Sequence, residues 1–360
     1  MQSLPSFVYQ ARPARIVFGP GSLQDLEREV LALGAERALV LSTPGQRKLA
    51  EALADRLGSR AAGIFDRAVM HVPIEVAQEA REMARVRRAD CAIAIGGGST
   101  IGLGKAIALD SALPILAIPT TYAGSEVTPI YGITEGGTKR TGTDLRVLPK
   151  TVLYDPALTL GLPVNLSITS GINAIAHAAE GLYARDANPV IDLMAEAGIR
   201  AFAMALPRIR ADAADIEARS GALYGAWLCG TVLGNVGMSL HHKLCHTLGG
   251  SFDLPHAQTH TAVLPHALAY NAPAAPDAMR RIARALDAAD APRGIYDLAQ
   301  NNGAAVALRD LGMLESDLDR AADIAIANPY WNPRPIERAA LRQLLQAAFD
   351  GAPPHVGGYR

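Results

Sequence analysis

Cysteine is scarce in this sequence, with three residues at positions 91, 229 and 245 in a chain of 360. An odd and scattered set provides no disulfide framework, which is typical of a reducing compartment, and we therefore expect a cytoplasmic protein. Cys245 stands among histidines, so it is a candidate nucleophile or metal ligand. A small buried hydrophobic residue is the simpler interpretation of it.

An excess of charge of one sign is also missing, because 34 Lys and Arg residues face 35 Asp and Glu residues and the net charge is −1. Surfaces for nucleic acid or anionic membrane are rich in clustered basic residues, so neither partner is expected. No segment approaches the roughly 20 consecutive apolar residues that cross a bilayer, and the first residues lack the pattern of a signal peptide. We expect a soluble protein with a small molecule as its partner.

Two domains are expected, because 360 residues exceed what a single hydrophobic core usually holds. Over residues 1–156, short β-rich runs alternate with helical segments, which predicts a Rossmann-like α/β domain with a mostly parallel sheet. Residues 157–360 are rich in Ala and Leu at helical spacing, and they predict an all-α second domain. The expected strands are 15–18, 38–41, 61–65, 91–95, 115–118 and 151–154, and the expected helices of the first domain are 46–58, 73–87 and 99–109.

A run of three glycines, Gly96, Gly97 and Gly98, follows the fourth expected strand, and Ser99 and Thr100 then begin a helix. Without side chains the backbone can approach a diphosphate closely, and the N-terminus of a helix favours its negative charge. The pattern therefore predicts a phosphate cradle for a dinucleotide. It is neither the spaced-glycine Rossmann fingerprint nor a P-loop, so a tight turn is the alternative interpretation.

Hydroxyl side chains follow two neighbouring strands, at the carboxyl edge where open α/β sheets bind ligands. The second strand is followed by no Asp or Glu that would bind a ribose 2′-hydroxyl and exclude a 2′-phosphate, so both NADH and NADPH remain open as the cofactor. Scattered basic residues in the same region are usually surface residues, and they are weaker candidates. The candidate cofactor contacts beside the glycines are Ser42, Thr43, Thr120, Thr121, Ser125 and Lys139.

Six of the nine histidines fall between positions 241 and 266, and a seventh, His177, follows Asn173 by four residues. On a helix this spacing places two side chains on one face, which is how helices offer ligands to zinc or iron. Asn173 stands where a carboxylate would be expected, and an amide cannot neutralise a dication. We therefore predict a site that keeps the geometry and lacks the metal. Helix capping is the alternative role for Asn173.

The chain resembles the iron-containing alcohol dehydrogenase superfamily over nearly its whole length, in the order and spacing of four motifs. These motifs lie at residues 96–99, 119–126, 173–177 and 242–256. The resemblance implies a dehydroquinate synthase-like fold. The ligands of metal-binding members map onto Asn173, His177, His242 and His256, with His246 as a neighbouring family histidine.

Two departures from the metal-binding pattern point to one branch of the superfamily. Asn173 and Gly102 both stand where metal-dependent relatives carry Asp, and together with residues 241–246 and 252–256 they resemble the maleylacetate reductases. That resemblance implies an NAD(P)H-dependent reduction of the carbon–carbon double bond of maleylacetate to 3-oxoadipate, in the degradation of aromatic compounds. It also implies a homodimer and no need for a metal.

The chemistry of such a reaction suits histidines. Hydride addition to an enone moves charge onto the ketone oxygen, and this enolate needs hydrogen-bond donors and a proton at the α carbon. We hypothesise that His177, His242 and His256, with His246 nearby, surround the substrate, one as the acid and the others as donors. Lys243 is the candidate partner of a substrate carboxylate.

Three other functions remain open from the sequence. The first is a metal-dependent alcohol dehydrogenase in which Asn173 still binds the ion. The second is a lyase on the same scaffold, as in the dehydroquinate synthases, which retain NAD. The third is a nucleotide-binding module whose catalytic site has decayed.

Overall fold

The computed structural model describes residues 7–12, 14–327, 330–355 and 359, and its chain divides into two compact units. The α/β unit is Ala11–Leu162, and the helical unit is Pro163–Arg360 together with the stretch that ends at Gln10. The sequence placed this division after residue 156 and gave the first residues to the α/β domain. The structure places it after Leu162, because Leu158, in the short helix after the last strand, packs against the apolar core of the sheet.

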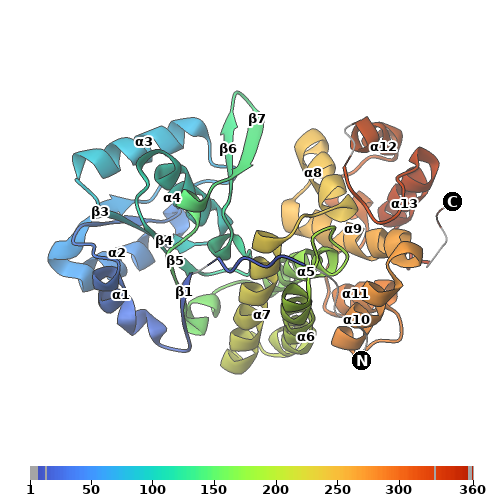
Figure 1. Ribbon diagram of the computed structural model, residues 1–360, viewed down its shortest axis with the longest axis horizontal. Helices are drawn as coiled ribbons and strands as arrows, with labels where there is room; N and C mark the ends of the chain where they lie inside the picture. Colours follow the sequence, from blue (N-terminus) through green and yellow to red (C-terminus); the bar gives the residue numbers. More distant parts are fainter. Residues whose placement is uncertain (1–6, 13, 328–329, 356–358, 360) are drawn as a thin grey trace. The chain divides into compact units, whose positions relative to one another are not determined.

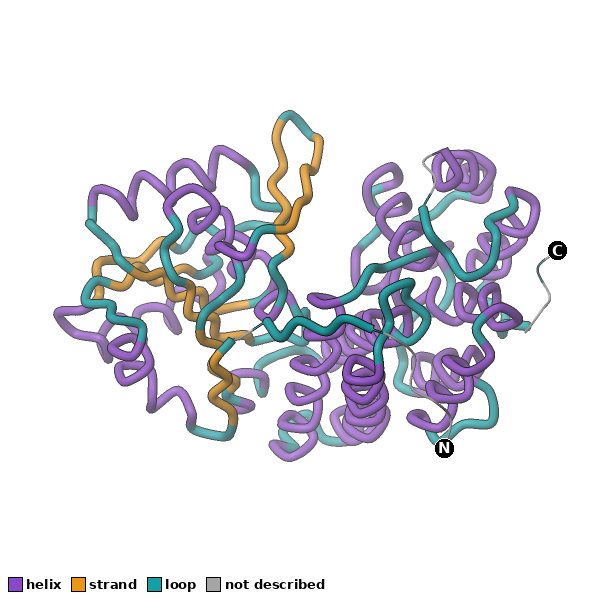
Figure 2. Tube along the Cα trace, in the orientation of Figure 1, coloured by secondary structure: helices purple, strands orange, loops and turns teal. Residues whose placement is uncertain are grey.

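The α/β unit contains a six-stranded sheet with the order β1-β8-β5-β4-β2-β3. Every adjacent pair is parallel, as the alternation of strands and helices predicts. Figures 1 and 2 show the strands of this unit among its helices. The inner strands β8, β5, β4 and β2 are buried along their whole length, as expected for a parallel sheet covered on both faces. The strands are β1 (Arg15–Phe18), β2 (Ala38–Leu41), β3 (Ala61–Phe65), β4 (Cys91–Gly96), β5 (Ile115–Pro119) and β8 (Thr151–Tyr154).

The helices of the α/β unit are α1 (Leu26–Ala32), α2 (Arg47–Leu57), α3 (Ile74–Val86) and α4 (Gly98–Ser111). The last three match the sequence prediction within two residues at each end, and α1 was not predicted. Helix α2 buries Ala50, Leu53 and Leu57, whose spacing places them on one face. Helix α4 is buried along most of its length, because it contacts β4, β5 and the hairpin described next.

An antiparallel hairpin that was not predicted consists of β6 (Ile130–Glu135) and β7 (Thr138–Thr143). Figure 1 shows it projecting from the α/β unit. Its two-residue turn is Gly136-Gly137, with φ of 56° and 76°. Both values lie in the left-handed region that such turns require. Lys105 of α4 fixes the base of the hairpin, since its ammonium donates to the carbonyl oxygens of Thr128 and Ile130 at 2.9 and 2.7 Å.

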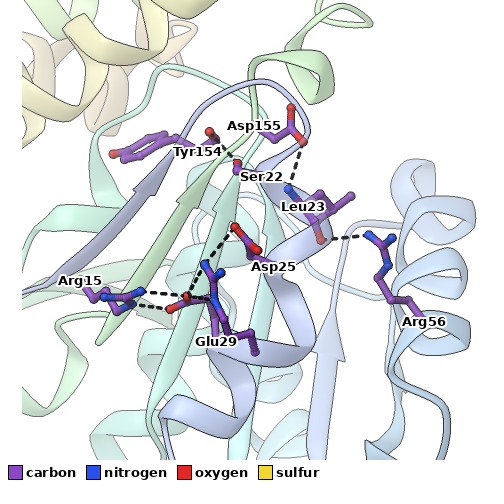
Figure 3. A network of polar contacts seen from close by, with 9 residues as sticks. Arg15, Ser22, Leu23, Asp25, Glu29, Arg56, Tyr154 and Asp155 are labelled. Carbon is purple, nitrogen blue, oxygen red and sulfur yellow. Dashed lines mark hydrogen bonds and ion pairs between the residues drawn. The ribbon is translucent and has the colours of Figure 1, made fainter.

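The connection between β1 and α1 is held against the end of β8 by side-chain hydrogen bonds (Figure 3). The carboxylate of Asp155 accepts from the backbone N–H groups of Gly21 and Leu23, both at 3.1 Å. The hydroxyl of Ser22 donates to the carbonyl oxygen of Tyr154 at 3.0 Å. These hydrogen bonds give backbone groups of the turn partners that no neighbouring strand provides.

The helical unit is all-α in its described residues, as the sequence predicts. Helices α5, α6 and α7 pack on one another, and α6 and α7 approach closely at Gly225, where a Cβ would lie 2.8 Å from the ring of Phe202. Helix α9 contacts α5, α8, α11 and α13, so it is the central helix of the unit. The helices are α5 (Val164–Gly181), α6 (Pro189–Ala211), α7 (Ile216–Asn235), α8 (Leu240–Phe252), α9 (His256–Asn271), α10 (Pro276–Leu286), α11 (Ala291–Asn301), α12 (Leu318–Ala327) and α13 (Arg338–Asp350).

Among the described residues, no helix is both long enough and apolar enough to cross a lipid bilayer.

Candidate active site and cofactor cradle

Helix α5 presents three buried polar side chains, Asn173, His177 and Glu180, with exposures of 5%, 4% and 0%. Their spacing of four and three residues places them on one face of the helix. Because α5 begins at Val164, Asn173 lies well inside the helix, and the capping interpretation of this residue is wrong. The sequence analysis did not single out Glu180.

Glu180 joins α5 to the beginning of α8. Its carboxylate accepts hydrogen bonds from the backbone N–H and hydroxyl of Ser239 at 2.9 and 2.8 Å, and from the backbone N–H of His241 at 2.8 Å. It also accepts from the Nδ1 of His242 at 2.7 Å. The first N–H groups of a helix lack partners within that helix, so Glu180 caps α8 from another element and places negative charge at its positive end.

The ionisation of Glu180 decides which nitrogen of His242 carries a proton. Burial alone would raise the pKa of Glu180, but the hydrogen bonds from His242 and Ser239 and the nearby imidazoles lower it to about 2. An ionised carboxylate only accepts hydrogen bonds, so the Nδ1 of His242 is the protonated nitrogen. Its Nε2 is left to meet a ligand.

Three buried polar atoms at this place have no hydrogen-bond partner among the described residues: Asn173 Oδ1, His177 Nδ1 and His242 Nε2. The rings of His177 and His242 are stacked, with their centroids 5.1 Å apart. Buried polar atoms are rarely left unpaired in native proteins, so such a set indicates a ligand position. Burial, together with the nearby histidines, holds the pKa of His177 well below its usual range, so this ring is neutral.

The other two predicted histidines are exposed. His246 lies one turn along α8 from His242, with ring centroids 6.3 Å apart, and His256 begins α9 with its ring 4.4 Å from that of His260. Lys243 is half-buried, and its ammonium lies over the ring of Tyr330, 5.6 Å from the centroid. The helical unit therefore brings the predicted catalytic residues to one region, with two at its exposed side.

The metal set that the resemblance implies is incomplete here. Asn173 contributes a neutral amide where the resemblance implies a carboxylate, and the negative charge beside this set is that of Glu180, the hydrogen-bond partner of His242. In the described part of the chain, His177, His242 and His256 do not form a group whose ligand atoms all lie within 4.8 Å of one another, whereas His241, Cys245 and His260 do. The amide at position 173 therefore distinguishes this set from the carboxylate-containing set that the resemblance implies.

In the α/β unit, the glycine run forms a tight cradle between β4 and α4. Gly96 has a φ of +148°, and a Cβ there would lie 2.5 Å from Thr100 Oγ1 and 2.7 Å from Gln46 Oε1. A Cβ on Gly97 would lie 3.1 Å from the side chain of Thr121. A side chain at Gly96 or Gly97 would meet these neighbours, so the two glycines keep the backbone compact beside the helix N-terminus, as the binding of a phosphate group there requires.

Hydroxyl and amide side chains surround the cradle at the ends of β2 and β5, which flank β4. Gln46, which the sequence analysis missed, donates to the hydroxyl of Thr120 at 2.8 Å. The hydroxyls of Ser42 and Thr100 are buried and have no partner among the described residues, as expected for groups that meet a ligand. The half-buried predicted contacts at this edge are Thr43, Ser99, Thr121 and Ser125, and Gly98 is exposed.

Lys139 and Gly102 are two further positions that the sequence singled out. Lys139 belongs to β7, but its side chain lies outside the described residues. Gly102, a position at which the resemblance implies Asp in metal-dependent members, packs under Val72, and a Cβ at position 102 would lie 2.9 Å from that side chain. Any larger residue at Gly102 would therefore displace Val72.

Two family models cover most of the chain. Residues 13–156 match the iron-containing alcohol dehydrogenase model, and residues 167–349 match the C-terminal model of the Fe-containing alcohol dehydrogenase family. These matches follow the division into an α/β and a helical part.

The chain is also similar to characterised proteins over nearly its full length. It is 64% identical to the maleylacetate reductase of Burkholderia cepacia, over 97% of this chain and 99% of the relative. The crystal structure of maleylacetate reductase from Agrobacterium tumefaciens superposes with a TM-score of 0.96 at 58% identity, covering 98% of this chain and 100% of that one. An iron-containing alcohol dehydrogenase from Corynebacterium glutamicum gives a TM-score of 0.93 at 45% identity, covering 97% and 98%.

Proposed function

Because the chain belongs to the iron-containing alcohol dehydrogenase family, and within it to the maleylacetate reductases, we propose that this oxidoreductase reduces the carbon–carbon double bond of maleylacetate to give 3-oxoadipate. The reductant is NADH or NADPH, and the reaction needs no metal. The product belongs to the degradation of aromatic compounds. The observation that carries the proposal is the buried amide of Asn173 beside a histidine anchored to a carboxylate.

The substrate sets two tasks for the protein. Maleylacetate is a dicarboxylate whose double bond is conjugated to a ketone, so reduction at the β carbon moves negative charge onto the ketone oxygen. When bound at the cradle of Gly96, the nicotinamide supplies the hydride. The side chains must hold the enolate oxygen and deliver a proton to the α carbon.

His242 is suited to deliver that proton. Its Nδ1 is fixed on Glu180 at 2.7 Å, so the ring presents Nε2 to the substrate. A proton carried at Nε2 is the one that the ring can transfer to the α carbon of the substrate. His177 is neutral, so it serves as a hydrogen-bond partner of the enolate oxygen and not as the acid.

The exposed side of the site suits the charges of a dicarboxylate. His246 and His256 are exposed, and Lys243 is half-buried beside Tyr330. A cation at the edge of a buried site can hold a carboxylate that stays partly in water. We assign Lys243 to one carboxylate of the substrate and His246 and His256 to the rim.

The chemistry of the residues supports the proposal that the reaction needs no metal. A divalent ion would polarise the ketone as a Lewis acid. An enone needs less polarisation than an isolated ketone, and the imidazoles of His177 and His242 can stabilise the enolate by hydrogen bonds. An amide at position 173 adds no negative charge to the site beyond that of Glu180.

The family pattern also supports a homodimer in the cytoplasm. The three cysteines are free and buried, which agrees with a reducing compartment. Sedimentation of the purified protein tests the dimer.

An assay of NADH and NADPH oxidation tests the proposed function. We expect rapid oxidation of one or both cofactors with maleylacetate and slow oxidation with simple aldehydes. If aldehydes are the better substrates and activity follows added Fe²⁺ or Zn²⁺, the protein is a metal-dependent alcohol dehydrogenase. If substrate is consumed without net loss of NADH or NADPH, it is a lyase.

A further inference from the structure

We propose that His241, Cys245 and His260 form a buried three-coordinate site for a soft monovalent cation of the Cu⁺ type. This site is separate from the set that the family uses, and the proposal does not depend on which substrate the enzyme reduces. It rests on the position, the burial and the ligand chemistry of the three side chains.

The three ligands come from two adjacent helices. His241 and Cys245 are four residues apart on α8, so they share one face, and His260 projects from α9, which packs on α8. The Sγ of Cys245 lies 3.8 Å from the Nε2 of His241, and that nitrogen lies 2.9 Å from the Nδ1 of His260. One ligand atom from each residue lies within 4.8 Å of the other two.

Two of the three separations between ligand atoms can be compared with those around a bound ion, and the third, between Cys245 and His260, is below 4.8 Å. Bond lengths of about 2.0–2.3 Å to nitrogen and sulfur place two ligand atoms about 3.3–3.7 Å apart. The Sγ–Nε2 separation is near this range, and the sulfur also lies 3.9 Å from the Nδ1 of the same ring, so the imidazole of His241 must turn to direct Nε2 and Sγ at one ion. The two imidazole nitrogens must move apart by about 0.5 Å, which replaces their hydrogen bond with two bonds to the ion.

The environment favours a soft, singly charged ion over a harder divalent one. The exposures are 0% for His241, 2% for Cys245 and 1% for His260, so water has little access to provide a fourth ligand. A thiolate with two imidazoles is a soft ligand set, which suits Cu⁺. Zn²⁺ prefers four ligands in a tetrahedron, and it would leave an extra positive charge in a buried place.

The binding step balances in protons and charge. Burial holds the pKa of the Cys245 thiol well above its usual range, so the thiol is neutral before binding. Binding exchanges its proton for Cu⁺, and the proton leaves to solvent, so the centre stays neutral. The proton shared by the two imidazoles moves to the other nitrogen of its own ring, and no electron is transferred.

Occupation of this centre would also disturb the reductase site. The backbone N–H of His241 donates to Glu180 at 2.8 Å, and the ring of His241 lies edge-on to that of His242, with centroids 5.2 Å apart. Movement of His241 toward an ion would shift the carboxylate that orients His242. We expect the bound ion to inhibit the enzyme.

An anaerobic titration of the purified full-length protein with Cu⁺, against a competing chromophoric chelator, tests the site. We expect one tightly bound equivalent, with ultraviolet absorption from a copper–thiolate bond. Cys245→Ser and His260→Gln should each lose the equivalent and the absorption. Cys229→Ser is the matched control, because Cys229 is also buried but lies on α7, and it should bind as the wild type does.

Three outcomes would overturn the proposal. The first is no stoichiometric binding by a wild-type protein whose thermal unfolding is normal. The second is binding that survives Cys245→Ser or is equally lost in Cys229→Ser. The third is binding that is lost in His177→Gln but kept in His260→Gln, since the ion would then lie at the family position. Thermal unfolding of each variant, with Cys245→Ala as a second substitution, separates loss of ligands from loss of fold.

Discussion

Glu180 on α5 accepts a hydrogen bond from the Nδ1 of His242 on α8 at 2.7 Å. The same carboxylate accepts the backbone N–H groups at the beginning of α8, so one buried charge fixes both the helix and the orientation of the imidazole. This arrangement leaves His242 Nε2 as the atom that faces a ligand. It explains how a chain without the family's carboxylate at position 173 keeps an ordered histidine site.

Replacement of Glu180 by Gln is expected to lower kcat by at least about tenfold with a smaller change in KM, because an amide can donate as well as accept and so no longer fixes which nitrogen of His242 faces the substrate. Glu180→Asp should recover part of the loss if its shorter side chain still reaches Nδ1. The measurement is steady-state kinetics with maleylacetate, together with the far-ultraviolet circular dichroism of each variant. Glu217→Gln, at an exposed position on α7, is the control and should behave as the wild type. Wild-type kcat in a folded Glu180→Gln protein would contradict the assigned role.

Asn173→Asp restores the carboxylate of the metal-dependent relatives. The side chain at this position is 5% exposed, so the metal-free variant would bury an unpaired charge. We expect it to unfold at a lower temperature and to lose activity by about tenfold or more, and to bind a divalent ion more tightly than the wild type. Thermal unfolding with and without Zn²⁺ measures both effects. Asn165→Asp, at an exposed position in the first turn of α5, is the matched control. Unchanged stability and unchanged metal affinity in Asn173→Asp would contradict the account of this position.

Gly96→Ala tests the cofactor cradle. The added Cβ would meet Thr100 and Gln46 and would require a backbone conformation with φ of +148°, so we expect the Kd for NADH to rise by about tenfold or more. Titration of cofactor fluorescence measures this Kd without the substrate. Gly161→Ala is the control, because no atom lies within 4 Å of a Cβ there and its φ is ordinary. Equal affinities in the two variants would show that the glycine run is only a turn.

The buried His266 makes the stability of the protein sensitive to acid. Its Nδ1 and the hydroxyl of Tyr359 are hydrogen-bonded at 2.8 Å, and burial lowers the pKa of this imidazole to about 4. The unfolded chain takes up the proton near pH 6.5, so between pH 6.5 and about 4 it binds more protons than the folded chain. The free energy of unfolding should therefore fall as the pH falls through this window.

The size of this effect can be measured with His266→Gln. The difference between the pKa of His266 in the unfolded and folded chain corresponds to about 3 kcal/mol in the free energy of unfolding over the whole pH window. His266→Gln should lack this contribution to the pH dependence of stability. Urea unfolding midpoints at pH 7 and pH 4.5 make the comparison. His355→Gln, at an exposed position, is the control. Parallel pH dependence in His266→Gln and wild type would rule out this contribution.

Much of the fold was predictable because its signals are local. The sheet strands are short apolar runs, and the helices between them have one apolar face, so six strands and three helices were expected close to their observed positions. The hairpin at residues 130–143 was not, since its strands are half-exposed and carry Gly, Thr and charged residues in place of a clear apolar alternation. It is held by Lys105 from a distant helix, and such a contact has no local signal.

The candidate site was predictable only in part, for a similar reason. The spacing of Asn173, His177 and the residues of α8 indicated a shared face, and the structure places them together. Glu180 carries no signal by itself, because one Glu in a helix is usually exposed, and only its hydrogen bonds with the beginning of α8 make it a buried cap. Gln46 likewise gains its meaning from the neighbouring strand end, where it contacts Thr120.

The most direct test of the account is the reaction of metal-depleted protein with maleylacetate and NADH. After prolonged dialysis against chelator, with metal content confirmed by elemental analysis, we predict full activity and formation of 3-oxoadipate in a one-to-one ratio with the NADH oxidised. Nuclear magnetic resonance of the product identifies the reduced bond. Loss of activity on depletion and its recovery with stoichiometric Fe²⁺ or Zn²⁺, or a product in which the ketone and not the double bond is reduced, would contradict the account.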